Sequence, residues 1–237
     1  MGGPDFVGVG VQKAGTSWWY SLLCAHPQCA ADPLAKELHF FDRYWAEPFG
    51  EDAIAAYRRG FAGAYRGCTG EWTPRYLHDP WVPPLLRAAA PKSRLVVLLR
   101  DPIERYRSGL THSVGHDGWP PHPLLAADAF SRGLYGQQLE RLYRSFDPAQ
   151  VLVLQYEACV ADPARELQRT YEFLGLDPTF RPPAIGDRVR RTAGDKAPLP
   201  PHVAAALAEA YAGDLELLAK VAPHLDLGRW PTAGAGR

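Results

Sequence analysis

Short apolar runs alternate with longer amphipathic segments along this chain. Three runs, at residues 6–11, 94–99 and 151–155, are almost purely apolar and predict strands that are buried on both faces of a sheet. A shorter strand is expected at residues 70–76, where it runs into a proline turn. Helical spacing of apolar residues predicts helices over residues 16–25, 51–64, 82–90, 130–146, 162–174 and 201–219. This alternation predicts an α/β domain in three layers, with a central, mainly parallel sheet flanked by helices.

The first strand leads into a glycine-containing turn and then a helix. Gly10 and Gly15 have the spacing of the Walker A motif, G-x-x-x-x-G-K-[ST], but Thr16 stands at the lysine position and Lys13 lies inside the turn. Gly15 has no Cβ, so backbone N–H groups can approach a ligand closely. Thr16 and Ser17 add hydroxyls at a helix N-terminus, which attracts phosphate. The segment predicts a P-loop-like phosphate site that is not built for a magnesium–nucleoside triphosphate; an ordinary strand–turn–helix is the alternative.

A second candidate anion site follows the strand at residues 94–99. Arg100 ends this strand, Asp101 and Pro102 open a helix as its N-cap and first residue, and Ser108 lies about two turns further on. Ligands of open parallel sheets bind at the carboxyl ends of strands, where both Arg100 and the turn with Lys13 are expected. The arginine fork suits phosphate because it binds two oxygens at once. A structural salt bridge of Arg100 is the alternative.

The segment at residues 36–42, Lys-Glu-Leu-His-Phe-Phe-Asp, places two charged residues directly before an aromatic pair. It has no clear period, and an amphipathic helix would not place charges there. On spacing alone, Glu37 is a surface salt-bridge partner of Lys36 or of an arginine.

These motifs together resemble the sulfotransferases that use 3′-phosphoadenosine 5′-phosphosulfate (PAPS). Residues 36–42 resemble the K-E-x-H-F-F-D segment of the heparan sulfate branch, and the likeness extends over nearly the whole chain. The resemblance implies that Glu37 removes the acceptor proton, with His39 and Asp42 nearby, and that Lys13 neutralises the leaving phosphate oxygen. It implies that the turn binds the 5′-phosphosulfate, while Arg100 and Ser108 bind the 3′-phosphate. The residues expected to contact PAPS are Lys13, Ala14, Gly15, Thr16, Ser17, Arg100, Ser108, Arg191 and Lys196.

The resemblance also assigns residues on the acceptor side. It implies that His112 lies near the acceptor, as in the N-sulfating branch, and that residues 70–76 line the pocket, as in the family segment G-E-K-[ST]-x-x-Y. Trp72 stands where the family often has lysine, which favours a flatter or more apolar acceptor, and Trp119 is expected in a second pocket loop. His112 and His116 have a spacing that could suggest zinc, but no third ligand is placed to help, so no metal is predicted.

A basic, glycine-containing loop at residues 188–196 precedes the last predicted helix. Eukaryotic relatives have a longer loop here, rich in lysine and glycine, that closes over the 3′-phosphate, and this sequence does not match it. Arg191 and Lys196 are predicted to substitute for that loop. A solvated basic loop is the alternative.

Composition limits the setting of this chemistry. The 237 residues predict one domain at residues 1–230 with a disordered tail at 231–237, and the balance of 26 basic and 26 acidic residues gives no reason to expect nucleic acid as a partner. The four cysteines lack metal-ligand spacing and are expected to be buried thiols in a reducing compartment. No signal peptide or apolar run of membrane-spanning length is evident, so we expect a soluble, cytoplasmic enzyme of bacterial type.

The sequence therefore predicts a sulfotransferase that moves the sulfonyl group of PAPS to a hydroxyl or amine of a small-molecule, natural-product or carbohydrate acceptor. No metal is needed, because Lys13 and helix N–H groups supply the positive field. A kinase-like phosphotransferase and a catalytically inactive nucleotide-binding protein are the alternatives. Neither the acceptor's identity nor the oligomeric state is predicted.

Overall fold

The fold is built on one four-stranded sheet, seen in a computed structural model that describes residues 2–32, 36–62, 67–114, 121–183, 185–186 and 199–234. The strand order is β2-β1-β3-β4, and every pairing is parallel. The strands are β1 (Phe6–Gly10), β2 (Gly70–Trp72), β3 (Arg94–Leu99) and β4 (Val151–Gln155). The predicted α/β fold with a parallel central sheet and the positions of all four strands are confirmed.

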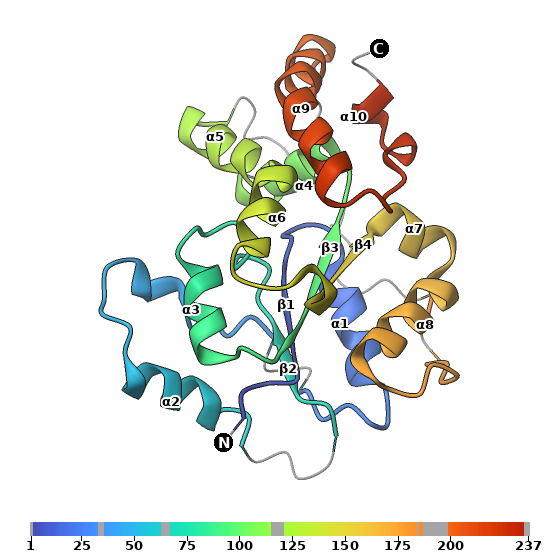
Figure 1. Ribbon diagram of the computed structural model, residues 1–237. Coiled ribbons are helices and arrows are strands. Elements are labelled where there is room, and N and C mark those ends of the chain that lie inside the picture. Colours follow the sequence, from blue (N-terminus) through green and yellow to red (C-terminus); the bar gives the residue numbers. More distant parts are fainter. Residues whose placement is uncertain are drawn as a thin grey trace.

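Helices cover both faces of this sheet (Figure 1). The helices α1 and α8 lie on one face, and α3 and α6 lie on the other, while α4, α5 and α9 gather beyond the carboxyl ends of the strands. In chain order the helices are α1 (Thr16–Cys24), α2 (Glu51–Arg59), α3 (Val82–Ala89), α4 (Pro102–Val114), α5 (Pro123–Ser131), α6 (Tyr135–Tyr143), α7 (Tyr156–Ala161), α8 (Pro163–Leu174), α9 (Pro201–Val221) and α10 (Pro231–Gly234). Short 3-10 turns follow at η2 (Asp42–Trp45), η3 (Pro148–Gln150) and η4 (Leu227–Arg229).

The central strands are apolar because helices exclude water from both of their faces. Every residue of β1 is buried, and so is every residue of β3 after Arg94. The two strands align Phe6 with Arg94 and Val7 with Leu95, with a register shift between Gly8 and Gly10. On the face that carries α1, the Trp19 indole packs in the core and donates a hydrogen bond of 3.2 Å to Thr170 of α8.

The strand order places a topological switch point between β1 and β3. The chain leaves β1 toward β2 on one side, and it leaves β3 toward β4 on the other. The loops after two such strands diverge and leave room between them, which is where open α/β sheets bind ligands. The turn with Lys13 follows β1 and Arg100 follows β3, so the topology brings the two predicted phosphate sites to the same place.

The prediction of one long helix over residues 130–146 is wrong. Instead, α5 ends at Ser131 and α6 begins at Tyr135. At the break, a Cβ on Gly133 would lie 2.5 Å from the hydroxyl of Tyr211, and this hydroxyl donates a 2.9 Å hydrogen bond to the carbonyl of Phe130. The chain turns here because Tyr211 of α9 packs directly on the glycine.

The predicted disordered tail is also wrong for residues 231–234, which form α10. Thr232 is buried there, and its hydroxyl donates a 2.8 Å hydrogen bond to the Asp101 carboxylate. The same carboxylate accepts from the backbone N–H of Glu104, as an N-cap of α4 should. The C-terminal segment is therefore bound to the start of the helix that follows Arg100. The assignment of residues 1–230 as one domain stays a prediction.

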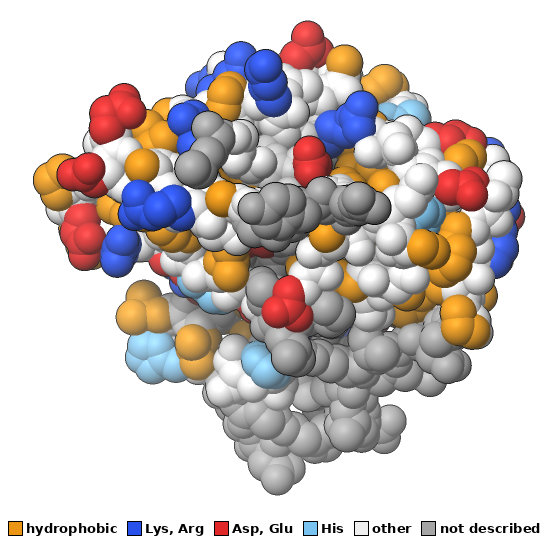
Figure 2. Space-filling model, turned by 90° about the horizontal axis from the view of Figure 1, so that it is seen from below, with side chains coloured by type: hydrophobic (Ala, Val, Ile, Leu, Met, Phe, Trp, Pro, Cys, Tyr) orange, Lys and Arg blue, Asp and Glu red, His pale blue; other side chains and the backbone are white. Residues whose placement is uncertain are grey.

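The surface and the cysteines complete the description. Viewed from the amino ends of the strands, basic and acidic side chains occur in small groups among hydrophobic ones (Figure 2), in keeping with the balanced net charge. The four cysteines are free thiols, but only Cys159 is fully buried, so the expectation that all four are buried is wrong. Within the described ranges, no helix has the length and apolar character needed to span a bilayer.

Candidate functional site

The amino end of α1 is prepared to bind an anion. Its N-cap is Gly15, which has a left-handed φ of 86° and contributes no side-chain hydrogen bond to the helix. The first N–H groups of a helix have no partners within the helix, so here they remain for a ligand. Of the two hydroxyl residues that follow, Thr16 is buried and Ser17 is partly exposed.

A side chain at position 15 would also collide with Tyr156, the residue that follows β4. A Cβ at this position would lie 2.8 Å from Cε2 of Tyr156, the first residue of α7. The Tyr156 ring in turn lies 4.9 Å from the guanidinium carbon of Arg100, in cation–π contact, and packs edge-on against Trp18. Tyr156 therefore connects the phosphate-binding turn to Arg100. We did not predict this role, although the position of Tyr156 directly after a buried strand could have suggested it.

Lys13 follows β1, Arg100 follows β3, and Glu37 is hydrogen-bonded to the last residue of β2, so all three lie at the carboxyl end of the sheet. Arg100 donates a 3.1 Å hydrogen bond from Nη1 to the carbonyl oxygen of Lys13. Partial burial lowers the pKa of the Lys13 ammonium, and attraction to the Glu37 carboxylate opposes that shift. The predicted base and the predicted cation are thus close enough to interact, although the sequence separates them by more than twenty residues.

Glu37 belongs to a short chain of polar contacts. His39 contacts the Asp42 carboxylate through Nδ1 at 2.8 Å, and its Nε2 lies 3.6 Å from Oε2 of Glu37. Lys36 forms an ion pair with the other oxygen, Oε1, so the salt bridge considered as the alternative is present as well. Burial by itself raises the pKa of Glu37, but Lys36 and His39 together outweigh it and hold that pKa below its usual value. Glu37 is therefore ionised at neutral pH and able to accept a proton.

Backbone strain is concentrated at the same residues. Among the described non-glycine residues, a positive φ occurs at Lys13 (68°), Glu37 (67°) and His39 (51°). Such conformations cost about 1–3 kcal/mol each and persist only where the surrounding structure enforces them. Three of the four residues predicted to be catalytic carry this strain, which indicates that the fold holds them in one specific arrangement.

Of the two residues predicted to bind the 3′-phosphate, Arg100 is held by an ion pair, and Ser108 lies further along the same helix. Arg100 Nη2 lies 3.4 Å from Oε2 of Glu104, one turn along α4, and Arg107 pairs with the other oxygen of that carboxylate at 2.8 Å. Ser108 is buried on the same helix, and within the described ranges no hydrogen bond joins it to Arg100. The salt bridge considered for Arg100 therefore exists, and its role in binding a 3′-phosphate stays a prediction.

On the acceptor side, the structure corrects one expectation and leaves others open. Trp72 does not line a pocket: its side chain is fully buried over Gly8, and its indole Nε1 donates to the carbonyl of Gly10 at 3.2 Å. The side chain of His112 is exposed near the end of α4, and no described contact joins it to Lys13 or Glu37. The predicted residues that lie outside the described ranges are His116, Trp119, Arg191 and Lys196. Within those ranges, no group of three metal-ligating side chains occurs.

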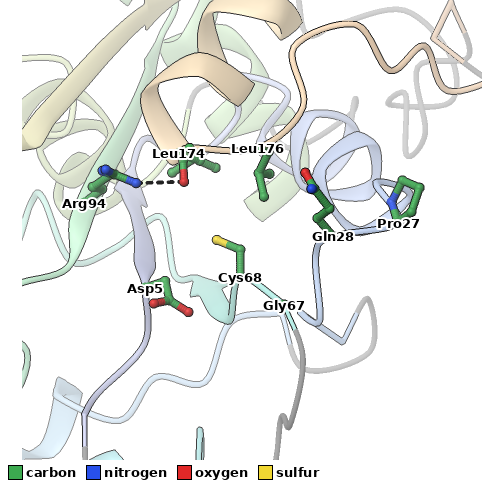
Figure 3. Close-up of a pocket in the computed structure, with 9 residues that line it drawn as sticks. Asp5, Pro27, Gln28, Gly67, Cys68, Arg94, Leu174 and Leu176 are labelled. Carbon is green, nitrogen blue, oxygen red and sulfur yellow. Dashed lines mark hydrogen bonds between the residues drawn. The ribbon is translucent and has the colours of Figure 1, made fainter.

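A separate cavity of about 540 Å³ lies at the amino ends of the strands (Figure 3). It is lined by Asp5, which precedes β1, by Arg94, which begins β3, and by Cys68 and Leu176. Arg94 donates a 2.7 Å hydrogen bond to the carbonyl of Leu174, shown as the dashed line. Because it lies at the amino ends of the strands, this cavity is separate from the site around Lys13 and Glu37.

A parallel sheet with a glycine-containing, anion-binding turn at its switch point defines an α/β domain of the P-loop-like class. A family model described as a sulfotransferase domain matches residues 3–193. The chain belongs to this sulfotransferase family.

Similar proteins of known name agree with this assignment. The human heparan sulfate glucosamine 3-O-sulfotransferase 6 is 32% identical over 188 residues, which are 73% of this chain and 52% of that protein. The mouse heparan sulfate glucosamine 3-O-sulfotransferase 3B1 is 31% identical over 189 residues, which are 73% of this chain and 46% of that protein. The chain thus spans about half the length of the curated relatives it matches.

Solved structures give the same picture. The crystal structure of a sulfotransferase from Alicyclobacillus acidocaldarius aligns with a TM-score of 0.76 and 26% identity, covering 97% of this chain and 99% of that one. The sulfotransferase domain from the curacin biosynthetic pathway shares the fold, with a TM-score of 0.59 and 16% identity over 86% of this chain and 82% of that one.

Proposed function

We propose that this protein transfers the sulfonyl group of PAPS to a hydroxyl group of an acceptor. The observation that carries the proposal is the electrostatic attraction between Lys13, in the turn before the uncapped amino end of α1, and the Glu37 carboxylate. One group is a cation beside an anion-binding turn, and the other is a carboxylate that stays ionised at neutral pH. Transfer of an anionic group to a hydroxyl needs both a positive field and a base.

The uncapped N–H groups and the Lys13 ammonium fit an anionic donor. Residues 13–17 would hold the 5′-phosphosulfate, and Arg100 and Ser108 would hold the 3′-phosphate, with Arg191 and Lys196 contributing from the loop before α9. Bound PAPS supplies an activated sulfonyl group with a phosphate leaving group. Glu37 would accept the proton of the acceptor hydroxyl, whose oxygen would replace the phosphate oxygen on the sulfonyl group. Lys13 would neutralise the negative charge of the departing phosphate.

His39 supports Glu37 in this scheme. Its imidazole lies between the carboxylates of Glu37 and Asp42, with 2.8 Å to the Asp42 oxygen. Asp42 fixes the orientation of the ring, and the ring in turn orients the Glu37 oxygen that faces it. His112 remains a second candidate base, although the described contacts do not place it beside Lys13.

The acceptor class is a small molecule, natural product or carbohydrate with a hydroxyl group, and an amine acceptor is the alternative. The curated relatives are named for heparan sulfate, but this chain spans only about half of their length. Trp72 is buried in the core, so it neither supplies a cation to a sulfated acceptor nor offers it an apolar wall. We further propose a cytoplasmic location, in keeping with the four free cysteine thiols.

A kinase-like phosphotransferase would need a lysine after Gly15, where this chain has Thr16. The decisive measurement is titration calorimetry with adenosine 3′,5′-bisphosphate, 5′-AMP and ATP, with and without magnesium. We expect adenosine 3′,5′-bisphosphate to bind much more tightly than the other two, independently of magnesium. Equal affinity for 5′-AMP would remove the 3′-phosphate site, and a preference for magnesium–ATP would favour the kinase-like alternative.

Activity separates an enzyme from an inactive binding protein. The protein is incubated with PAPS or ATP and a panel of alcohols and amines, and product is followed by mass spectrometry. A mass gain of one sulfonyl group on an alcohol, formed with PAPS only, is the expected result. Tight nucleotide binding with no product across the panel, and no hydrolysis of PAPS, would support the inactive alternative.

A further inference from the structure

The segment that carries Glu37 is anchored through four consecutive backbone N–H groups. Glu37 N–H donates to the carbonyl of Trp72 at 3.1 Å, His39 N–H approaches Oγ1 of Thr73 at 3.5 Å, and Phe40 N–H donates to the hydroxyl of Tyr76 at 2.9 Å. The N–H of Leu38 hydrogen-bonds the carboxylate of Glu71. All four acceptors lie in β2 or in the turn that follows it.

Glu71 is at the centre of these anchors. Its side chain is only 1% exposed, and its two oxygens accept hydrogen bonds from Tyr57 at 2.8 Å and from Thr73 at 2.6 Å. One of these partners, Thr73, is itself the partner of His39 N–H. The carboxylate therefore acts on the segment twice, directly through Leu38 and indirectly by fixing the Thr73 hydroxyl.

The anchored residues are those with strained backbones. Glu37 and His39 have φ angles of 67° and 51°, while Leu38 lies between them. A side chain other than glycine stays in this region only if surrounding contacts outweigh the strain. The hydrogen bonds to residues 71–76 are contacts of that kind, because each fixes a donor whose direction depends on these φ angles.

A carboxylate is an unusual choice for a purely structural role at this position. Burial raises the pKa of Glu71, and although several hydrogen bonds oppose this shift, the pKa remains at about 7. An amide or an apolar side chain would avoid this desolvation, yet neither can accept hydrogen bonds from Tyr57, Thr73 and Leu38 together. The feature that sets Glu71 apart is its number of acceptor sites.

We infer that Glu71 is a positioning residue for the transfer reaction: it holds residues 37–39 in their left-handed conformation and so directs the Glu37 carboxylate toward Lys13. This inference rests on the proposed function, because it assigns Glu71 an effect that passes through the base. It also gives a physical reason for the spacing of Glu71, Thr73 and Tyr76, whose side chains all serve residues 37–40.

The first test is the variant Glu71→Gln, which keeps shape but replaces one acceptor oxygen with a donor. We expect kcat to fall on the order of 10²-fold, the scale for a small misplacement of a catalytic group, while affinity for adenosine 3′,5′-bisphosphate stays unchanged. The matched control is Glu166→Gln, a buried carboxylate on α8 that pairs with Arg169. The control should leave kcat unchanged even if it lowers the melting temperature.

The second test separates positioning from a general loss of structure. If Glu71 acts through Glu37, then adding Glu71→Gln to Glu37→Gln should lower kcat by less than threefold, although each change alone has a large effect. Full additivity of the two effects, or unchanged kcat in Glu71→Gln alone, would overturn the inference.

A crystal structure of Glu71→Gln gives a readout that does not depend on activity. We expect Glu37 and His39 to leave the left-handed region, and unchanged φ angles there would contradict the inference. Failure of the proposed function is distinguishable, because it would appear as a wild-type protein without PAPS turnover, whatever the conformation of residues 37–39.

Discussion

The change Gly15→Ala tests how tightly the phosphate-binding turn is built. Gly15 has a φ of 86°, and its missing Cβ would lie 2.8 Å from Cε2 and 3.0 Å from Cδ2 of the Tyr156 ring. The left-handed backbone costs alanine about 1–2 kcal/mol. Overpacking against a held ring adds about 1–3 kcal/mol, because Tyr156 lies against both Arg100 and Trp18.

We therefore expect Gly15→Ala to lower the free energy of unfolding by about 3 kcal/mol. For a chain of this size, that corresponds to a drop of roughly 6–12 °C in melting temperature. Binding of adenosine 3′,5′-bisphosphate should weaken by about tenfold or more, the equivalent of one hydrogen bond to a charged group. Calorimetric unfolding and nucleotide titration measure the two effects separately.

Two further variants isolate the causes. Gly213→Ala makes the same chemical change inside α9, where an added Cβ meets nothing within 4 Å, so it should raise stability by about 0.5–1 kcal/mol. The variant Tyr156→Ala removes the ring that a Cβ at position 15 would meet. In that background, Gly15→Ala should lower the free energy of unfolding only by the cost of the left-handed backbone. If Gly15→Ala melts like the wild type and binds nucleotide normally, the left-handed turn and its packing on Tyr156 are not what holds the site.

Three other predictions concern the chemistry. Glu37→Gln should lower turnover of a hydroxyl acceptor by about 10²–10⁴-fold with nearly unchanged cofactor affinity, whereas Lys13→Ala should damage both; near-normal turnover of Glu37→Gln would move attention to His39 or His112. Arg100→Ala should weaken binding of adenosine 3′,5′-bisphosphate by roughly 2–3 kcal/mol without unfolding the protein, and unchanged affinity would leave Arg100 a purely structural partner of Glu104. Glu71 should make stability depend on pH: its pKa is about 7 when folded against a usual 4.5, so its contribution is complete below pH 4.5 and is lost as pH rises through about 7. Chemical unfolding at a series of pH values should show the free energy of unfolding of the wild type falling by up to about 3 kcal/mol relative to Glu71→Gln across this range. The facing groups Tyr20, Tyr57 and Tyr76 have raised pKa values and stay neutral there, so they do not contribute to this change. A difference between the two proteins that does not change with pH would refute the assignment.

Much of the fold could be predicted because it depends on local sequence patterns. The apolar runs of β1, β3 and β4 predict buried strands. Asp162 and Pro163 mark the start of α8, and Gly175 marks its end. The candidate chemistry was also local, since Lys13 lies in a turn of fixed spacing and Glu37 directly precedes an aromatic pair. Signals of this kind need only a few neighbouring residues, which the sequence supplies by itself.

The tertiary structure decided what these local features do to one another. Packing from α9 divides the expected helix at Gly133, and burial removes Trp72 from the predicted pocket. The meeting of Lys13 with Glu37 depends on the strand order, and the anchoring of residues 37–40 depends on side chains more than thirty positions away in β2 and its turn. No periodicity or spacing encodes such distant contacts, because they arise only when the sheet and its helices pack and exclude water from groups such as Glu71.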